Sequence, residues 1–189
     1  ILDIGGESSR PGAKPVSESE ELFRVLPVIE ALREESDALL SIDTMKPSVA
    51  AQAIRAGVSI VNDIGGMRLE EMRRVIAQTG AGVICMHMKG IPSTMQQSPE
   101  YGDVVADVRD FFEQTFHRCV EEGVKEEQLM FDPGIGFGKT ERHNLLLLKN
   151  LKSLGIRDRP LALGVSRKSF LARAAGCESL ESRVWPTVA

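Results

Sequence analysis

The sequence has few aromatic residues and few cysteines. Aromatic side chains make up 5% of the 189 residues, with one Trp and one Tyr, and there are three cysteines. Cys85, Cys119 and Cys177 are odd in number and far apart, without a Cys-x-x-Cys pair, which excludes a disulfide framework and a zinc finger. We therefore expect reduced thiols, as in a cytoplasmic protein.

An excess of positive charge and long apolar runs are also lacking. The 23 basic and 27 acidic residues give a formal net charge of −4, and the basic residues are scattered along the chain. A nucleic acid partner is therefore not expected. Nor is a membrane, because no apolar run approaches the roughly 20 residues that span a bilayer. The apolar fraction of 42% and charged fraction of 26% are typical of a globular domain.

Short runs rich in Ile, Val and Leu recur along the chain. Each is almost continuously apolar, which is typical of a strand buried on both faces of a parallel sheet. The runs are residues 1–6, 39–44, 59–64, 82–88, 129–134 and 161–166. Helical patterns lie between them, so a strand followed by a helix occurs six times. This order predicts an α/β fold with parallel strands.

Capping residues and apolar periodicity predict the helices. Ser17 begins a capping-box-like Ser-x-x-Glu, and apolar residues then repeat every three or four positions, with Pro27 inside that helix. The following helices are expected to stop at Gly57 and Gly80, where glycine suits a left-handed cap. Further helices are expected over residues 103–123, which is the longest, 142–155, 169–176 and 179–185.

A (β/α)8 barrel accounts for this order better than an open sheet. No Gly-x-Gly-x-x-Gly follows the first strand, as it would in a dinucleotide-binding sheet. A barrel needs about 250 residues, so about six of the eight units fit. The chain starts in a buried strand without an initiator Met. We expect one barrel domain over residues 1–189 that lacks one strand before Ile1 and one after Ala189.

Polar side chains gather at the carboxyl ends of the expected strands. One such residue often caps a helix or fixes its own loop, but one on every strand predicts a small-molecule site at the rim where barrel enzymes bind ligands. Only one of Asn62 and Asp63 can face the barrel axis, because neighbours in a strand face opposite sides. The full set is Glu7, Asp43, Asn62 with Asp63, His87, Asp132 and Ser166.

Three of these strand ends invite a closer interpretation. Residues 5–15 form a long loop with hydroxyl groups and one Arg, which suits a mobile loop that closes on a substrate, or else a solvated connector. His87 is expected to be a hydrogen-bonded structural residue more than a metal ligand. Residues 166–169 bring hydroxyl and basic groups to a helix start, where an anion or a carbonyl group can bind.

The stretch DPGIGFGKT, residues 132–140, has the glycines of a phosphate-binding loop. A Walker A motif needs G-x-x-x-x-G-K-[ST], and its first glycine would fall at Pro133. The stretch instead predicts a strand that carries Asp132 to the rim, and then a loop whose glycines let a flat ligand approach the backbone. Lys139 and Thr140 are expected to matter least.

In order, the motifs ILDIGGESSRPGA, SIDTMKP, VNDI, MHM, DPGIGFGK and GVSRKSF make the chain resemble the dihydropteroate synthase family over essentially all its residues. The resemblance implies a (β/α)8 barrel, usually a homodimer, in folate biosynthesis. It implies a transferase that joins 7,8-dihydropterin-6-ylmethyl diphosphate to p-aminobenzoate and releases diphosphate with Mg²⁺. In this family, sulfonamides compete with p-aminobenzoate.

The resemblance also implies site residues, with Asp43, Asp132 and Lys168 as the catalytic ones. The pterin is expected against Asp43, Asn62, Met86, Asp132, Gly136 and Lys168. The p-aminobenzoate or sulfonamide is expected against Ser9, Arg10, Pro11, Phe137 and Ser169. The chemistry agrees, since a carboxylate can accept both donors of the pterin amino and N3–H edge, and an ammonium can donate to its carbonyl.

Two departures from the family pattern are visible. Ser9 stands where the family commonly has Thr, which keeps the hydroxyl and loses a methyl contact. The family's Asn metal ligand would lie before Ile1 and its Arg-x-His after Ala189, so no metal ligand is expected within these residues, and this segment alone is expected to be inactive. The alternatives are the pterin-binding domain of a methyltetrahydrofolate-dependent methyltransferase and a non-catalytic pterin-binding protein.

Overall fold

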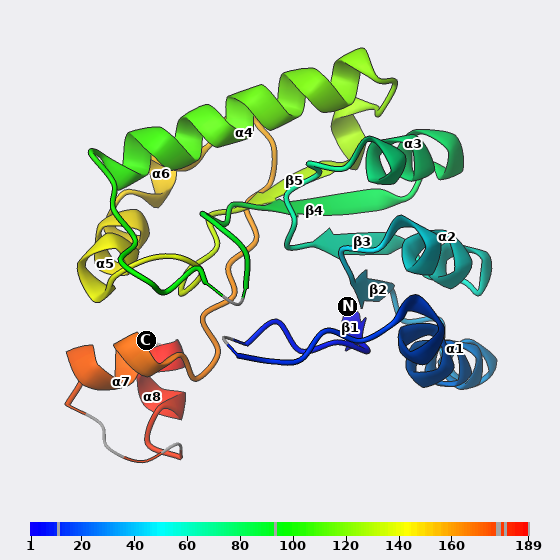
Figure 1. The fold of residues 1–189 in the computed structure, drawn as a ribbon, viewed down its shortest axis with the longest axis horizontal. Helices are drawn as coiled ribbons and strands as arrows, with labels where there is room; N and C mark the ends of the chain where they lie inside the picture. The colour runs from blue at the N-terminus through cyan, green and yellow to red at the C-terminus, as the bar shows by residue number, and fades with distance from the viewer. Residues whose placement is uncertain (11, 93, 177–178, 180, 189) are drawn as a thin grey trace.

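The computed structural model describes residues 1–10, 12–92, 94–176, 179 and 181–188, and it consists of strand and helix units in alternation (Figure 1). A short 3-10 turn, Glu126–Gln128, precedes the last strand. The other elements are β1 (Leu2–Gly5), α1 (Glu18–Glu35), β2 (Leu40–Asp43), α2 (Pro47–Arg55), β3 (Ile60–Asp63), α3 (Glu70–Thr79), β4 (Gly82–Met86), α4 (Val104–Glu121), β5 (Leu129–Asp132), α5 (Glu141–Lys149), α6 (Leu151–Leu154), α7 (Ser169–Ala174) and α8 (Val184–Val188).

The five strands form one sheet in the chain order β1-β2-β3-β4-β5, and every neighbouring pair is parallel. Helix α2 packs between α1 and α3, and α4 packs against α5 and α6, so the helices follow one another around the outside of the sheet (Figure 1). Sequential parallel strands inside a ring of helices are the arrangement of a (β/α)8 barrel. The expected fold class is confirmed.

The expectation of a sixth strand over residues 161–166 is wrong. Leu161 makes a single parallel bridge to Phe131 of β5. Two hydrogen bonds flank it, from Phe131 N to Pro160 O (3.0 Å) and from Ala162 N to Phe131 O (2.8 Å). Pro160 has no N–H to extend the ladder, and from Leu163 onward the chain is largely exposed. This largely apolar run therefore pairs with β5 through one residue.

Strand alternation separates a buried outer side of the sheet from an inner side. Ile42, Val61 and Phe131 are fully buried in the apolar core that the helices cover. Their strand neighbours therefore point to the inner side, because successive side chains alternate. These neighbours are Asp43, Asn62 and Asp132.

Most helix signals are confirmed. Ser17 caps α1 by accepting a hydrogen bond from Glu20 N, and α1 contains Pro27. Gly80 ends α3 with φ of 74°. In the described residues, no helix combines the length and apolar character that crossing a membrane requires.

Three helix predictions need correction. The helix over 103–123 is not longer than the first, since α1 and α4 each have 18 residues. The helix expected over 142–155 breaks into α5 and α6 at Asn150, whose side-chain Nδ2 donates to Leu146 O (2.8 Å) and so competes with the regular backbone pattern. The last helix begins only at Val184, later than predicted.

Candidate functional site

The inner side of the sheet aligns the expected pterin residues of neighbouring strands. Asp43 is the register partner of Asn62 across β2 and β3, and Met86 is the partner of Asp132 across β4 and β5. All four stand at the carboxyl ends of their strands, the face where barrel enzymes bind substrates.

The structure distinguishes Asn62 from Asp63. The Asp63 carboxylate is 3% exposed and accepts hydrogen bonds from Gly65 N (2.7 Å) and Met67 N (2.8 Å), so it fixes its own turn. Asn62 faces the other way, and its Nδ2 donates to Asp3 Oδ2 at 3.1 Å. Asn62 is therefore the member of the pair that faces the inner site.

Asp3 was missed by the sequence analysis. It lies on β1, and its carboxylate accepts hydrogen bonds from Ser41 and from Asn62, which ties three neighbouring strands together. The sequence feature that could have identified Asp3 is that it is the one acid inside an apolar run, two residues before Gly5. That run indicated a strand, and the alternation within it could have shown that Asp3 faces inward with Gly5.

Asp43 is surrounded by negative charge. Burial raises its pKa to about 7, and the charges of Asp3, Glu21, Asp63 and Glu7 add to this effect. Near neutral pH the carboxyl group is therefore present in both protonation states. It can donate a hydrogen bond to a ligand in one state and accept one in the other.

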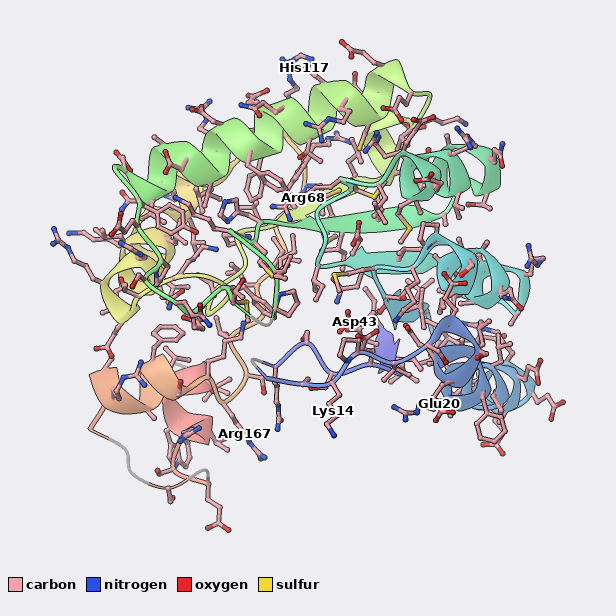
Figure 2. The ribbon with its side chains drawn as sticks, in the orientation of Figure 1. Lys14, Glu20, Asp43, Arg68, His117 and Arg167 are labelled. Carbon is pink, nitrogen blue, oxygen red and sulfur yellow. The ribbon has the colours of Figure 1, made fainter. Side chains whose placement is uncertain are left out.

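The loop after β1 is anchored beside Asp43. The Lys46 ammonium forms ion pairs with Glu7 of this loop and with Glu21 of α1, which is 1% exposed. Figure 2 shows Asp43 next to this loop, whereas His117 stands on the outer face of α4. A cavity of about 450 Å³ opens here, and its lining includes Ser8, Ser9, Asp43, Thr44, Met45 and Arg68.

Asp132 and Lys168 form the second half of the site. Asp132 Oδ1 accepts a hydrogen bond from Gly134 N at 2.6 Å. Burial raises the pKa of Asp132, whereas the Gly134 N–H and the charges of Lys168 and Lys139 lower it. Burial lowers the pKa of Lys168 to about 8, and Asp132 opposes this shift. A half-buried acid and base thus lie at the end of β5.

The glycine-rich loop packs closely on Lys168. Gly136 has φ of 84°, and a Cβ there would lie 3.2 Å from Lys168 Cδ. The Lys168 ammonium donates to Ile135 O and lies 4.8 Å from the centre of the Phe137 ring. Gly136 and Phe137 therefore flank the ammonium group.

Met86 connects the two halves. It is buried in a small apolar cluster with Ile64, Met88 and Met95, and Met45 and Phe137 pack against that cluster. Met45 lines the cavity beside Asp43, and Phe137 contacts Lys168. The inner floor between the two charged groups is thus apolar, which suits a flat ring.

The expected p-aminobenzoate residues fall into two places. Ser9 lines the cavity near Asp43, and Arg10 is exposed on the same loop. Ser169 is exposed at the start of α7, directly after Lys168. Pro11 lies outside the described residues. Among the described residues, no hydrogen bond or ion pair joins Ser9 or Arg10 to Phe137 or Ser169.

Ser166 and Arg167 are not brought into the site by any described contact. Both are exposed, and Arg167 has φ of 50°. Figure 2 shows Arg167 pointing away from the strands. Of Arg167 and Lys168, Lys168 is the one that reaches the glycine-rich loop.

The sequence analysis gave Lys139 and Thr140 no role, and the structure shows that both have structural ones. Lys139 is 3% exposed, and its ammonium lies 3.0 Å from His87 Nδ1. Thr140 caps α5 by accepting a hydrogen bond from His143 N. Lysine is usually on the surface, and no sequence signal indicated that Lys139 is buried. The prediction that His87 is a hydrogen-bonded structural residue is confirmed.

Burial shifts the pKa values of both His87 and Lys139 toward their neutral forms. Burial lowers the pKa of His87 to about 3, with help from the charges of Lys139 and Arg68. Burial also lowers the pKa of Lys139 to about 7, where Asp132 opposes the shift and Lys168 adds to it. His87 is therefore neutral at physiological pH.

The described residues contain no group of three or more His, Cys, Asp or Glu side chains that could hold a metal ion. Carboxylate and amide oxygens are what Mg²⁺ prefers, but Asp3, Glu7 and Asp132 are engaged instead with Ser41, Asn62, Lys46 and the Gly134 N–H. These residues do not by themselves fit a Mg²⁺ site.

Comparison with known proteins identifies relatives over nearly the whole chain. A dihydropteroate synthase of Synechocystis sp. is 46% identical over 188 residues, which are 99% of this chain and 65% of that protein. The Escherichia coli dihydropteroate synthase is 43% identical over 173 residues, which are 92% of this chain and 61% of that protein. The chain therefore spans less than two thirds of the length of these relatives.

Solved structures agree with the barrel. A Yersinia pestis dihydropteroate synthase with a sulfonamide drug complex has a TM-score of 0.91 at 43% identity, covering 97% of this chain and 66% of that one. A Xanthomonas albilineans dihydropteroate synthase with 4-aminobenzoic acid has a TM-score of 0.92 at 40% identity, covering 99% and 66%. Residues 1–189 also match the family model described as pterin binding enzyme, and the chain belongs to that family.

Proposed function

We propose that the protein is a dihydropteroate synthase. It would join 7,8-dihydropterin-6-ylmethyl diphosphate to p-aminobenzoate and give 7,8-dihydropteroate and diphosphate. The observation that carries this proposal is the pair Asp132 and Lys168 at the end of β5, with Gly136 and Phe137 beside the ammonium group. Relatives of similar sequence include structures with 4-aminobenzoic acid, with 7,8-dihydropteroate and with a sulfonamide.

Asp132 and Lys168 would recognise opposite kinds of group on the pterin. The Asp132 carboxylate has one oxygen on Gly134 N and keeps acceptor capacity for the 2-amino and N3–H donors. The Lys168 ammonium would donate to the neighbouring pterin carbonyl. Because both groups are partly buried, these charge-assisted hydrogen bonds are stronger than they would be in water.

Asn62 and Asp43 would complete pterin binding from β3 and β2. Asn62 is both a donor and an acceptor, so it can serve the amino group and a ring nitrogen together. Asp43, when ionised, would accept a ring N–H and stabilise the positive charge that develops as the C–O bond breaks. Met86 would supply an apolar floor under the ring.

The reaction is a substitution at the methylene carbon. The arylamine nitrogen forms the new N–C bond, diphosphate leaves with the electron pair of the C–O bond, and the nitrogen then loses a proton. The arylamine is a fair nucleophile, so alignment and charge stabilisation would be the main catalytic effects. Asp43, Asp132 and Lys168 are the proposed catalytic residues.

The p-aminobenzoate would bind between the loop after β1 and the Phe137 side of the site. Phe137 would pack against its ring, and Ser9, Arg10, Pro11 and Ser169 would lie around it. Ser9 at the cavity wall and Phe137 beside Lys168 support this placement. A sulfonamide would compete for the same position.

Further properties are part of the proposal. Residues 1–189 would belong to a single pterin-binding barrel domain, in a homodimer in the cytoplasm. Mg²⁺ would accompany the diphosphate, with ligands other than the described residues, and none of the steps above depends on the ion.

A two-substrate assay tests the proposed function in the protein as its gene encodes it. The protein is incubated with dihydropterin diphosphate, with and without p-aminobenzoate, and diphosphate and dihydropteroate are measured. Formation of both products only with p-aminobenzoate is the expected result. Binding of the pterin without turnover would point to a non-catalytic pterin-binding protein and would overturn the proposal.

A further inference from the structure

Lys139 is a buried lysine whose amino group has an unusual set of partners. Its ammonium lies 3.0 Å from His87 Nδ1, 3.0 Å from Gly134 O, 3.0 Å from Phe137 O and 3.3 Å from His87 O. Three N–H bonds thus meet four acceptors, which come from the segment after β4 and the loop after β5. An ammonium group can only donate, so when Lys139 is protonated the neutral His87 ring carries its proton on Nε2.

The backbones of these two segments approach each other so closely that residues 134 and 138 have no space for a side chain. A Cβ at Gly134 would lie 1.9 Å from His87 O, and a Cβ at Gly138 would lie 2.7 Å from Lys89 O. Both glycines have positive φ, of 64° and 59°. The loop 134–138 therefore lies directly on the backbone of residues 87–89, and Lys139 supplies the polar link between them.

The loop held in this way carries the groups that flank Lys168. Ile135 O accepts a hydrogen bond from the Lys168 ammonium, and the Phe137 ring lies 4.8 Å from it. The carbonyl of Phe137 is one of the Lys139 acceptors. A shift of the loop would therefore move the Phe137 ring and the Lys168 ammonium together.

We propose that Lys139 is a positioning residue. Its ammonium fixes the loop 134–138 on residues 87–89 and thereby sets where Phe137 and Lys168 stand toward the substrates. The expected change in KM rests on the proposed function. The expected loosening of the loop 134–138 does not depend on the proposed function. Lys139 touches no substrate in this account.

Amide hydrogen exchange tests the structural part. Lys139→Met keeps a long apolar stem and removes the donors, and Lys149→Met changes an exposed lysine at the end of α5 as the matched control. The protected amides are those of Phe137, which donates to Gly134 O, and Gly136, which donates to Asn144 Oδ1 (2.8 Å). We expect them to exchange about tenfold faster in Lys139→Met, with β2 and the control unchanged.

Steady-state kinetics test the positioning role. In Lys139→Met, the KM for p-aminobenzoate should rise about tenfold while kcat falls by less than about threefold, because the loop carries the Phe137 wall. A lysine with only a structural role would lower the melting temperature and leave KM unchanged. That result, or unchanged exchange of the loop amides, overturns the inference.

A second variant covers the case in which Lys139→Met does not fold. Tyr101 donates through its hydroxyl to Gly138 O at 2.8 Å, so Tyr101→Phe loosens the same loop without exposing a buried charge. The KM for p-aminobenzoate must rise here too, and an unchanged KM overturns the inference. If the wild-type protein shows no turnover, the proposed function fails, and exchange alone decides the role of Lys139.

Discussion

Asp132 and Lys168 lie on two sides of one glycine. A Cβ at Gly164 would stand 3.8 Å from Asp132 Oδ2 and 3.8 Å from Lys168 Nζ. An acid at the end of β5 and a base at the start of α7 thus lie on either side of a position that has no side chain. The adjacent carboxylate and ammonium can therefore bind one edge of a ligand, where the carboxylate accepts hydrogen bonds and the ammonium donates one.

Lys168→Met should weaken pterin binding about tenfold to a hundredfold, because one hydrogen bond to a charged group is lost. In the wild-type protein, affinity should also fall as pH rises through about 8, where Lys168 loses its proton. Titration of pterin affinity against pH measures both effects. Lys152→Met, at an exposed lysine of α6, is the control, and an equal loss there would contradict the assignment.

Asp43→Asn should change the pH dependence of stability. Burial and nearby acids raise the pKa of Asp43 from 3.8 to about 7, so the folded protein holds a proton that the unfolded chain has released. Stability from this group is present below about pH 4 and is lost as pH rises to about 7. Melting temperatures of wild type and variant between pH 4 and 8 measure it. Parallel curves would show that Asp43 does not titrate in this window.

His87→Gln should make the protein less sensitive to acid. The folded pKa of His87 is about 3 and the unfolded value 6.5, so the unfolded chain binds the proton first. Stability from the neutral ring is present above pH 6.5 and is lost as pH falls toward 3. Gln keeps an acceptor for Lys139. Urea unfolding at several acidic pH values compares it with His117→Gln, which changes an exposed ring and should behave as wild type.

Gly134→Ala should destabilise the protein by about 3 kcal/mol or more, since the new methyl group meets the His87 carbonyl and the backbone is left-handed. Gly12→Ala is the matched control. Gly12 also has positive φ, of 79°, but nothing lies within 4 Å of its Cβ position, so about 1–2 kcal/mol is expected. Unfolding free energies check the difference. Equal losses would show that backbone strain alone acts at Gly134.

Apolar runs and strand alternation predicted much of the fold and the inner site. Alternation correctly required that Asn62 and Asp63 face opposite sides, and burial then decided which one faces inward. The run 161–166 pairs through one residue because pairing depends on neighbouring strands and on Pro160, which a count of apolar residues does not show.

The burial of Lys139 and the contacts of Asp3 show what the sequence could not reveal. The burial of Lys139 depends on four acceptors that come together only when the loop 134–138 lies on residues 87–89. Asp3 is bound by side chains from the next two strands, which are 38 and 59 residues away along the chain. Both contacts are long-range, so no local pattern carries them.

Asp132→Asn tests the central claim most directly. The substitution keeps the shape and the acceptor for Gly134 N, but it removes the charge that would bind both donors of the pterin edge. Calorimetric titration with dihydropterin diphosphate should show affinity lowered about a hundredfold, with an unchanged melting temperature. Asp110→Asn, at an exposed acid of α4, should bind as wild type. Unchanged affinity in folded Asp132→Asn would contradict the account.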